Sequence, residues 1–230
     1  MVSVRSNLVN QILCKEALKS LPGLELKIIR RKGRFPEEET LEYLLGYSGV
    51  FHRLLVIKFF KGRPPFYRRW VEVFSIRPHI VFDSKTYTFI NSDEEEKLIK
   101  CLSDLINPGE RLFIEYVYDV ETWKALEVGI PPPLTRLGYI LLKNGFTWFK
   151  DWYFPEGFME GGPKLQVEKP LDEEARIRHL IEICNTAKEY VEKLKNFSLN
   201  NPYLEIRVKA MQRAENILVT LCKDYNNVHK

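Results

Sequence analysis

Two carboxylates lie at or just after an apolar segment, where they could move protons. Glu115 is part of "RLFIEYV" at 111–117, and Asp119 follows two residues later. A carboxylate in a cleft can accept the proton of an attacking amine, which is the role of a general base. We predict both residues as catalytic candidates. A structural role stays open for each, since an aspartate directly before a helix caps its free N–H groups.

A candidate anion site follows the three consecutive prolines at 131–133. Thr135 and Arg136 lie at the start of a helical pattern, where backbone N–H groups have no partner within the helix. A hydroxyl, a guanidinium and such N–H groups can together bind a phosphate or a carboxylate. We therefore predict Thr135 and Arg136 as cofactor contacts. The alternative is an arginine on a solvated helix face.

The segment "FTWFKDWYF" at 146–154 is rich in aromatic residues. On a strand its rings occupy both faces, and the charges of Lys150 and Asp151 point in opposite directions. An unpaired buried charge is costly, so neither face should be wholly dry. Glycines in the following "PEGFMEGG" permit a mobile loop. We expect most rings in the core and the rest lining a cleft. The predicted substrate contacts are Lys150, Asp151, Trp152 and Phe158, and Tyr153 is a third catalytic candidate.

Basic residues gather in the first third of the chain. Five lie between Lys27 and Arg34, and "FFKGRPPFYRRW" at 59–70 interleaves basic and aromatic side chains. Proteins that bind single-stranded nucleic acid combine positive charges with rings on which bases stack. An anion-binding or nucleic-acid-binding hairpin that uses Arg63, Arg68 and Arg69 is thus an alternative function. A solvated sheet face would carry the same residues.

The cysteines and histidines are too scattered to predict a metal site. Cys14, Cys101, Cys184 and Cys222 each fall within a helical pattern, far from one another. Metal sites need clustered ligands such as C-x2-C pairs. We predict four buried thiols, with no metal and no disulfide.

The order of elements predicts a mixed α/β fold. A first helix is expected at 6–20, then strands at 24–35, 40–50, 51–60, 68–76 and 86–90. A capped helix at 92–106 precedes a buried strand at 111–117, and short helices follow at 119–129 and 132–145. Strands at 146–154 and 163–170 complete a largely antiparallel sheet with helices on its faces. We expect the strands beginning near Arg111 and Phe146 to lie side by side and to leave a wet notch between them.

A composition change at Pro170 predicts two domains, 1–170 and 171–230. Helices at 172–196 and 204–225 should form an antiparallel hairpin. The expected apolar stripe of the first helix is Ile177, Ile181, Cys184, Val191 and Leu194. Two helices cannot bury such stripes alone, so we expect packing on the first domain or on a second copy, as a homodimer.

The totals describe an ordinary globular chain. It has 230 residues, 45% hydrophobic and 29% charged, with a net charge of +4. No apolar run reaches the roughly 18 residues of a membrane helix. The N-terminus lacks the continuous apolar core of an export signal, so we expect a cytoplasmic protein without membrane partners. Few glutamines beside many charged residues favour a thermophilic source.

The same element order resembles the GNAT N-acetyltransferase fold, with "LGYILLKNGFTWFKDWYF" as the most similar segment. The segments "RLFIEYVYDVETWKAL", "PPLTRLG" and "WFKDWYFPEG" also resemble an uncharacterised, mostly archaeal family of unknown function, over about residues 24–170. The resemblance implies a GNAT-like sheet in which the end of the central strand faces a substrate cleft. It also implies an acyl-CoA-dependent N-acyltransferase, or a small-molecule-binding protein derived from one.

One motif of that family is absent here. GNAT enzymes hold the acyl-CoA pyrophosphate with a loop of the type Q/R-x-x-G-x-G/A before a helix. The matching stretch, "RPHIVFDSKTYTFINSDEEE", contains no glycine and ends in four acidic residues. Like charges repel, so the resemblance implies an acyl-CoA site without its usual phosphate loop.

Overall fold

The computed structural model describes parts of the chain from Leu24 onward. The described residues are 24–32, 38–47, 50–60, 70–73, 79–82, 85–88, 96, 99–100, 103–104, 106–114, 117, 119–152, 163–197 and 200–223. The helix predicted at 6–20 and the connection between the strands at 51–60 and 68–76 lie outside them.

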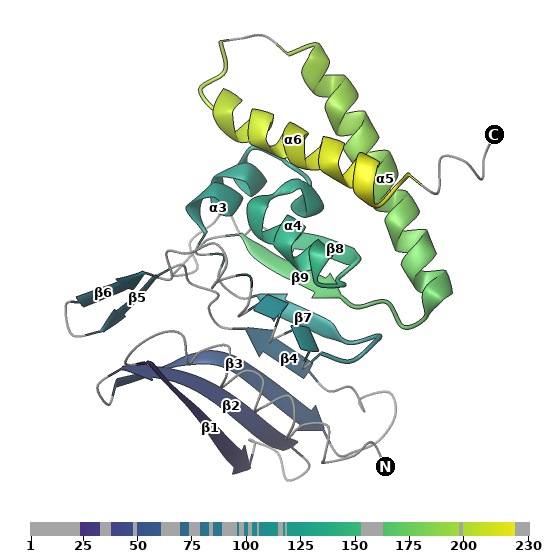
Figure 1. The fold of residues 1–230 in the computed structure, drawn as a ribbon. Helices are drawn as coiled ribbons and strands as arrows, with labels where there is room; N and C mark the ends of the chain where they lie inside the picture. The colour runs from purple at the N-terminus through teal and green to yellow at the C-terminus, as the bar shows by residue number, and fades with distance from the viewer. Residues whose placement is uncertain are drawn as a thin grey trace.

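Seven described strands form one mixed sheet in the order β1, β2, β3, β4, β7, β9, β8 (Figure 1). The pair β4–β7 is parallel, and the other neighbours are antiparallel. The predicted fold class is therefore confirmed. The strands are β1 (Leu24–Lys32), β2 (Glu38–Tyr47), β3 (Val50–Phe60), β4 (Trp70–Val73), β7 (Arg111–Ile114), β9 (Lys164–Glu168) and β8 (Trp148–Trp152).

A second, two-stranded sheet stands apart from the main one. It pairs β5 (His79–Phe82) with β6 (Lys85–Thr88) in antiparallel register. We predicted a strand at 86–90 but none at 79–82. This hairpin lies in the stretch where the family resemblance would place a phosphate loop.

Two short helices and a 3-10 turn connect β7 to β8. α3 (Val120–Glu127) begins after Asp119, and α4 (Arg136–Lys143) begins after Thr135. The single helix predicted at 132–145 is divided, because the extended backbone of Thr135 separates α4 from the turn η1 (Pro132–Leu134). Gly145 follows the end of α4 with φ +90°, a conformation that favours glycine.

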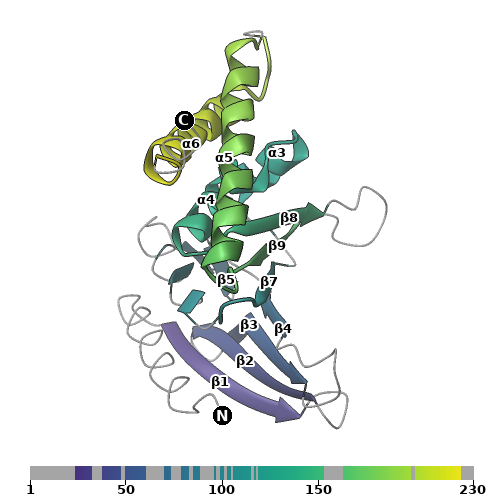
Figure 2. The same cartoon turned by 90° about the vertical axis from the view of Figure 1, so that its right-hand side faces the viewer.

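The C-terminal helices form the expected hairpin. α5 (Glu173–Lys195) begins after Asp172, whose carboxylate accepts a hydrogen bond from the N–H of Ala175, and it matches the predicted 172–196. α6 (Leu204–Thr220) ends earlier than predicted. The hairpin covers α3 and α4, which lie between it and the β8–β9 part of the sheet (Figures 1 and 2).

The hairpin and the short helices share one apolar core. The segment from α3 to α4 contributes Ala125, Ile130, Leu134 and Leu142. The hairpin and its C-terminal end contribute Leu180, Ile183, Ala187, Tyr190, Val191, Ala210, Ala214, Ile217 and Cys222. Ion pairs add to this contact, since Arg213 of α6 pairs with Glu121 of α3. The apolar face of the hairpin is thus occupied by its own chain.

The predicted apolar stripe of α5 is wrong in part. Ile181 is 37% exposed, whereas Leu180, Ile183 and Ala187 are buried. The buried face includes alanines, which the pattern of large apolar residues does not reveal. Ala187, Ala210 and Ala214 are fully buried, and small side chains let two helix backbones approach closely.

The prediction of four free thiols is also wrong. Cys184 of α5 and Cys222, after α6, form a disulfide with a sequence separation of 38 residues. The two cysteines are distant in the sequence, so their spacing did not indicate a pair. The helical hairpin brings them together. Cys14 and Cys101 lie outside the described residues.

Lys169 contacts two segments that precede it in the chain, one at Ser103 and one at Phe146. Its Nζ donates to the Ser103 carbonyl at 2.5 Å and lies 5.7 Å from the centre of the Phe146 ring. Ser103 Oγ in turn donates to the Asn144 carbonyl at 2.8 Å. Burial lowers the pKa of Lys169, while the charges of Asp104 and Glu110 act in the opposite direction.

The described residues at 96, 99–100 and 103–104 are helical, within the helix predicted at 92–106.

Candidate functional site

Three strands of the main sheet run in the same direction and end at one edge. β4 is parallel to β7, and β8 shares their direction because the antiparallel β9 lies between β7 and β8. Ile114 pairs with Leu165, which pairs with Asp151, so β7 and β8 end in register. Ligands of open α/β sheets bind beyond the carboxyl ends of such strands, where successive connections diverge.

This register corrects one expectation of the sequence. We expected the strands beginning near Arg111 and Phe146 to lie side by side and to leave a notch between them. β9 occupies that position. The last residues of the two strands, Ile114 of β7 and Trp152 of β8, nevertheless lie at the same edge of the sheet.

Asp119 lies five residues beyond the end of β7 and organises the start of α3. Its Oδ2 accepts hydrogen bonds from the N–H of Thr122 at 3.1 Å and from the Thr122 hydroxyl at 2.5 Å. The same hydroxyl accepts from the N–H of Leu137 at 2.9 Å. Asp119 is only 8% exposed. The capping role proposed as its structural alternative is therefore present.

Thr135 and Arg136 lie at the start of α4, as expected. Thr135 Oγ1 accepts from the N–H of Gly138 at 3.1 Å and donates to the Pro132 carbonyl at 2.7 Å. Arg136 Nη1 lies 3.5 Å from Asp119 Oδ1. The first N–H groups of α4 thus already have partners within the chain at Leu137 and Gly138. The guanidinium of Arg136 is the remaining predicted anion contact at this helix start.

The structure describes only some of the other predicted residues. Lys150 and Asp151 are exposed on β8, in agreement with the expectation that neither face of this strand is wholly dry. Trp152 ends the strand, and nothing is described of its side chain. Glu115, Tyr153, Phe158, Arg63, Arg68 and Arg69 lie outside the described residues.

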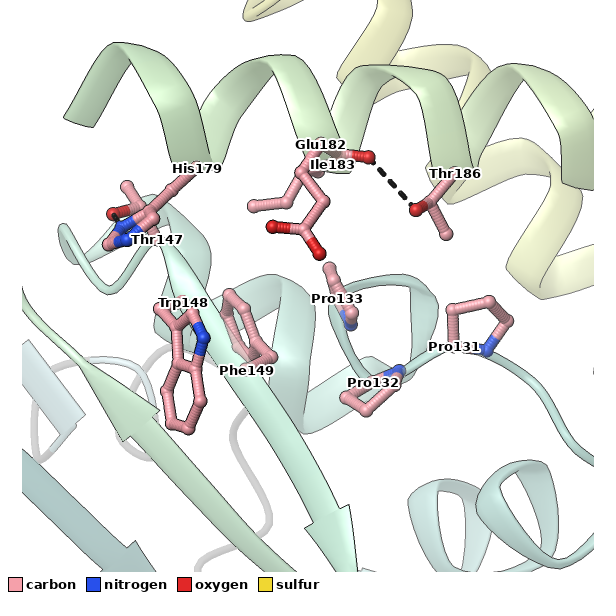
Figure 3. Close-up of a pocket in the computed structure, with 10 residues that line it drawn as sticks. All are labelled: Pro131, Pro132, Pro133, Thr147, Trp148, Phe149, His179, Glu182, Ile183 and Thr186. Atoms are coloured by element: carbon pink, nitrogen blue, oxygen red, sulfur yellow. Dashed lines mark hydrogen bonds between the residues drawn. The ribbon is translucent and has the colours of Figure 1, made fainter. Parts of the chain in front are cut away.

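A pocket that the sequence did not predict lies between α5, the proline turn and the start of β8 (Figure 3). Its volume is about 130 Å³. His179 Nδ1 and Thr147 Oγ1 are 3.0 Å apart at one end, and the side chain of Glu182 extends from α5 toward Pro133. The tautomer of the imidazole decides which of the two groups donates this hydrogen bond.

The sequence carried only a weak signal for this pocket. His179 and Glu182 are three residues apart, which places them on one helix face. Thr147, their neighbour in space, is 32 residues away from His179 in the chain. Only the packing of α5 against β8 brings them together.

Among the described residues, no cluster of histidine, cysteine, aspartate or glutamate could hold a metal ion. No helix in the described part of the chain combines the length and apolarity that crossing a membrane requires.

These features describe a mixed α/β protein with a polar sheet edge and a helical hairpin that closes its core. A family model described as "Protein of unknown function (DUF1122)" matches residues 24–194, and the chain belongs to this family. No curated protein matches the chain. A crystal structure of a protein of unknown function from Aquifex aeolicus VF5 is similar, with 37% sequence identity and a TM-score of 0.55. The match covers 81% of this chain and 88% of that one.

Proposed function

We propose that the protein is a divergent acyl-CoA-dependent N-acyltransferase whose cleft lies at the carboxyl edge of β4, β7 and β8. One observation carries the proposal. The single parallel pair described in the sheet, β4–β7, ends at this edge, and five residues after β7 the chain reaches Asp119, which pairs with Arg136. This is where a GNAT-like sheet would receive its substrates.

The residues have distinct roles in this proposal. Glu115 removes a proton from the acceptor amine, the amine nitrogen attacks the thioester carbonyl, and the CoA thiolate leaves. Asp119 is the weaker base candidate, because its carboxylate already accepts two hydrogen bonds from Thr122. Tyr153 is the second candidate for proton transfer, and Trp152 and Phe158 are proposed as walls of the cleft.

The donor must be held without a glycine loop. Arg136 is the proposed contact for a phosphate of CoA, with the hydroxyl of Thr135 beside it. Arginine binds phosphate through paired N–H donors, so one such residue can replace part of a backbone loop. Binding then requires Arg136 to exchange its 3.5 Å contact with Asp119 for the ligand.

Thermal unfolding with CoA and acetyl-CoA tests the proposal. We expect millimolar ligand to raise the melting temperature of the intact protein, and Arg136→Lys to reduce that rise. Glu115→Gln should abolish acetyl transfer to an amine yet preserve the CoA shift. Glu174→Gln, exposed on α5, is the matched control and should behave as the parent protein. An unchanged melting temperature at millimolar CoA would contradict the proposal.

The alternative functions have their own outcomes. Binding of mixed oligonucleotides that weakens steeply with salt, and that is lost in a variant of Arg63, Arg68 and Arg69, would favour a nucleic-acid-binding role. A stable dimer that dissociates on substitution of exposed hairpin residues such as Ile181 and Val219 would favour an assembly role.

A further inference from the structure

A second pocket lies at the other end of α3, away from the sheet edge. It has a volume of about 220 Å³ and is bounded by the C-terminal half of α5, the start of α6 and the turn after α3. Pro131 and Thr186 line both this pocket and the one beside β8, so the two are neighbours.

Arg207 reaches into this pocket from α6 with its guanidinium held on two sides. Its Nη2 donates to the Val128 carbonyl at 3.2 Å, and its guanidinium carbon lies 4.7 Å from the centre of the Phe197 ring. Its Nε is buried and has no hydrogen-bond partner within the described part of the chain. A fixed guanidinium thus retains one unused donor.

Tyr190 adds a second unused group. The residue is 8% exposed, and its buried hydroxyl also lacks a hydrogen-bond partner among the described residues. Arg207 lies beside the hydroxyl, in a contact that falls outside the usual geometric limits of a hydrogen bond. Burial raises the pKa of Tyr190, and the charge of Arg207 together with this close contact offsets part of that rise. The hydroxyl is therefore protonated at neutral pH and can donate.

Buried polar groups in proteins are almost always satisfied, so two neighbouring unsatisfied donors indicate a missing acceptor. We propose that this pocket binds a small organic carboxylate, with its oxygens accepting from Arg207 Nε and from the Tyr190 hydroxyl. Paired donors beside a cation are the usual way in which proteins hold a carboxylate.

The charge and the walls of the pocket favour a carboxylate over a phosphate. Lys193 and Glu189 lie on the rim, 3.9 Å apart, and compensate each other. Arg207 alone then sets the net charge, which one negative charge balances and a phosphate dianion would exceed. Leu194, Phe197 and Pro131 supply apolar surface for a short carbon chain. The pocket is smaller than the roughly 300–1,000 Å³ that hold drug-sized ligands.

Calorimetric titration of the full chain with sodium propionate, and separately with inorganic phosphate at matched ionic strength, tests this site. Propionate should bind saturably, and Arg207→Lys and Tyr190→Phe should each weaken it about tenfold, the effect of one lost hydrogen bond to a charged group. Arg178→Lys and Tyr203→Phe keep the same chemistry outside the pocket and should bind as the parent protein does.

The melting temperature of the ligand-free Tyr190→Phe variant provides a second measurement. Because the hydroxyl lacks a partner without ligand, the ligand-free variant should melt at or above the temperature of the parent protein. A clearly lower melting temperature would mean that the hydroxyl is already satisfied, which overturns the proposal. Absent propionate binding, equal binding by all variants, or tighter binding of phosphate would overturn it as well.

Discussion

At the residue scale, Gly138 in α4 packs directly against the proline turn. A Cβ atom on Gly138 would lie 1.8 Å from the Pro132 carbonyl oxygen and 2.9 Å from Thr135 Oγ1. The proline turn and the cap of α4 therefore require glycine at this position. The sequence "PPPLTRLG" contains all three residues, but it does not show that a side chain at Gly138 would collide with the Pro132 carbonyl oxygen.

Gly138→Ala should destabilise the protein, although alanine is the better helix former. Helix propensity alone would favour alanine by about 0.5–1 kcal/mol. The collision with backbone should outweigh this and cost at least about 2 kcal/mol. Urea unfolding measures the change. Asn185→Ala, on an exposed position of α5, isolates the propensity effect and should be neutral or stabilising. A more stable Gly138→Ala would contradict the described geometry.

The pKa of Tyr190 predicts a loss of stability in alkali. Burial raises it above the ordinary value of 10.0, with a partial offset by Arg207. Above pH 10 the unfolded chain releases this proton before the folded protein does. The free energy of unfolding then falls as pH rises. Tyr190→Phe removes this contribution.

Parallel denaturation of the parent and Tyr190→Phe from pH 8 to pH 11 measures the difference. The parent should lose stability more steeply above about pH 10, and the other tyrosines cancel in the comparison. Curves of equal slope would show that the environment of Tyr190 is as polar as water.

At the element scale, the ends of helices could be predicted because they depend on residues close in the sequence. Buried faces and short strands depend on contacts with other elements, and these were predicted less well. Asp172 and Asn196 mark the ends of α5 within one residue of the structure. The buried face of α5 was predicted only in part, because it includes the small side chain of Ala187, which a pattern of large apolar residues does not reveal. β5 escaped because its partner β6 is equally short, so neither has a long alternating pattern.

The disulfide between α5 and the end of α6 should be a major contribution to stability. It closes a loop with a sequence separation of 38 residues, for which chain entropy predicts about 4 kcal/mol. Cys184→Ser and Cys222→Ser should each lower the melting temperature, and reductant should lower that of the parent alone. Thiol titration of the unfolded chain before and after reduction counts the bonded pair. A parent protein that reductant leaves unchanged would contradict this expectation.

At the scale of the whole molecule, the boundary predicted near Pro170 separates two segments that share a core. Residues of α3 and α4 pack with those of α5 and α6 in one cluster, and Arg213 pairs with Glu121 across them. The family match also extends past Pro170, to residue 194. The change in composition at Pro170 indicated where the helical hairpin begins. Whether the hairpin is a separate domain depends on its packing against α3 and α4.

Deletion of residues 171–230 should therefore prevent stable folding of the remainder. It would expose Ile130, Leu134 and Leu142, which are buried beneath the hairpin. We expect loss of cooperative thermal unfolding and aggregation. Val219→Ala, at a position 65% exposed on α6, controls for a change in the hairpin that leaves the core intact. A truncated chain that unfolds cooperatively would show that 1–170 is an autonomous domain.

The candidate site illustrates the same division. Asp119 and Thr135 were correctly placed at helix starts from the sequence, since caps are local features. The pocket around His179 and Thr147, and that around Tyr190 and Arg207, join residues from distant helices and strands. No spacing rule connects such pairs until the hairpin is placed on α3 and α4.

The position of β9 between β7 and β8 has a consequence for biosynthesis. β8 leaves the ribosome before β9, yet its only described sheet neighbour is β9. The aromatic segment around Trp148 must therefore wait without a partner until residues 164–168 emerge and insert beside β7. During that interval the backbone N–H and C=O groups of β8 lack the partners that β9 provides in the folded protein.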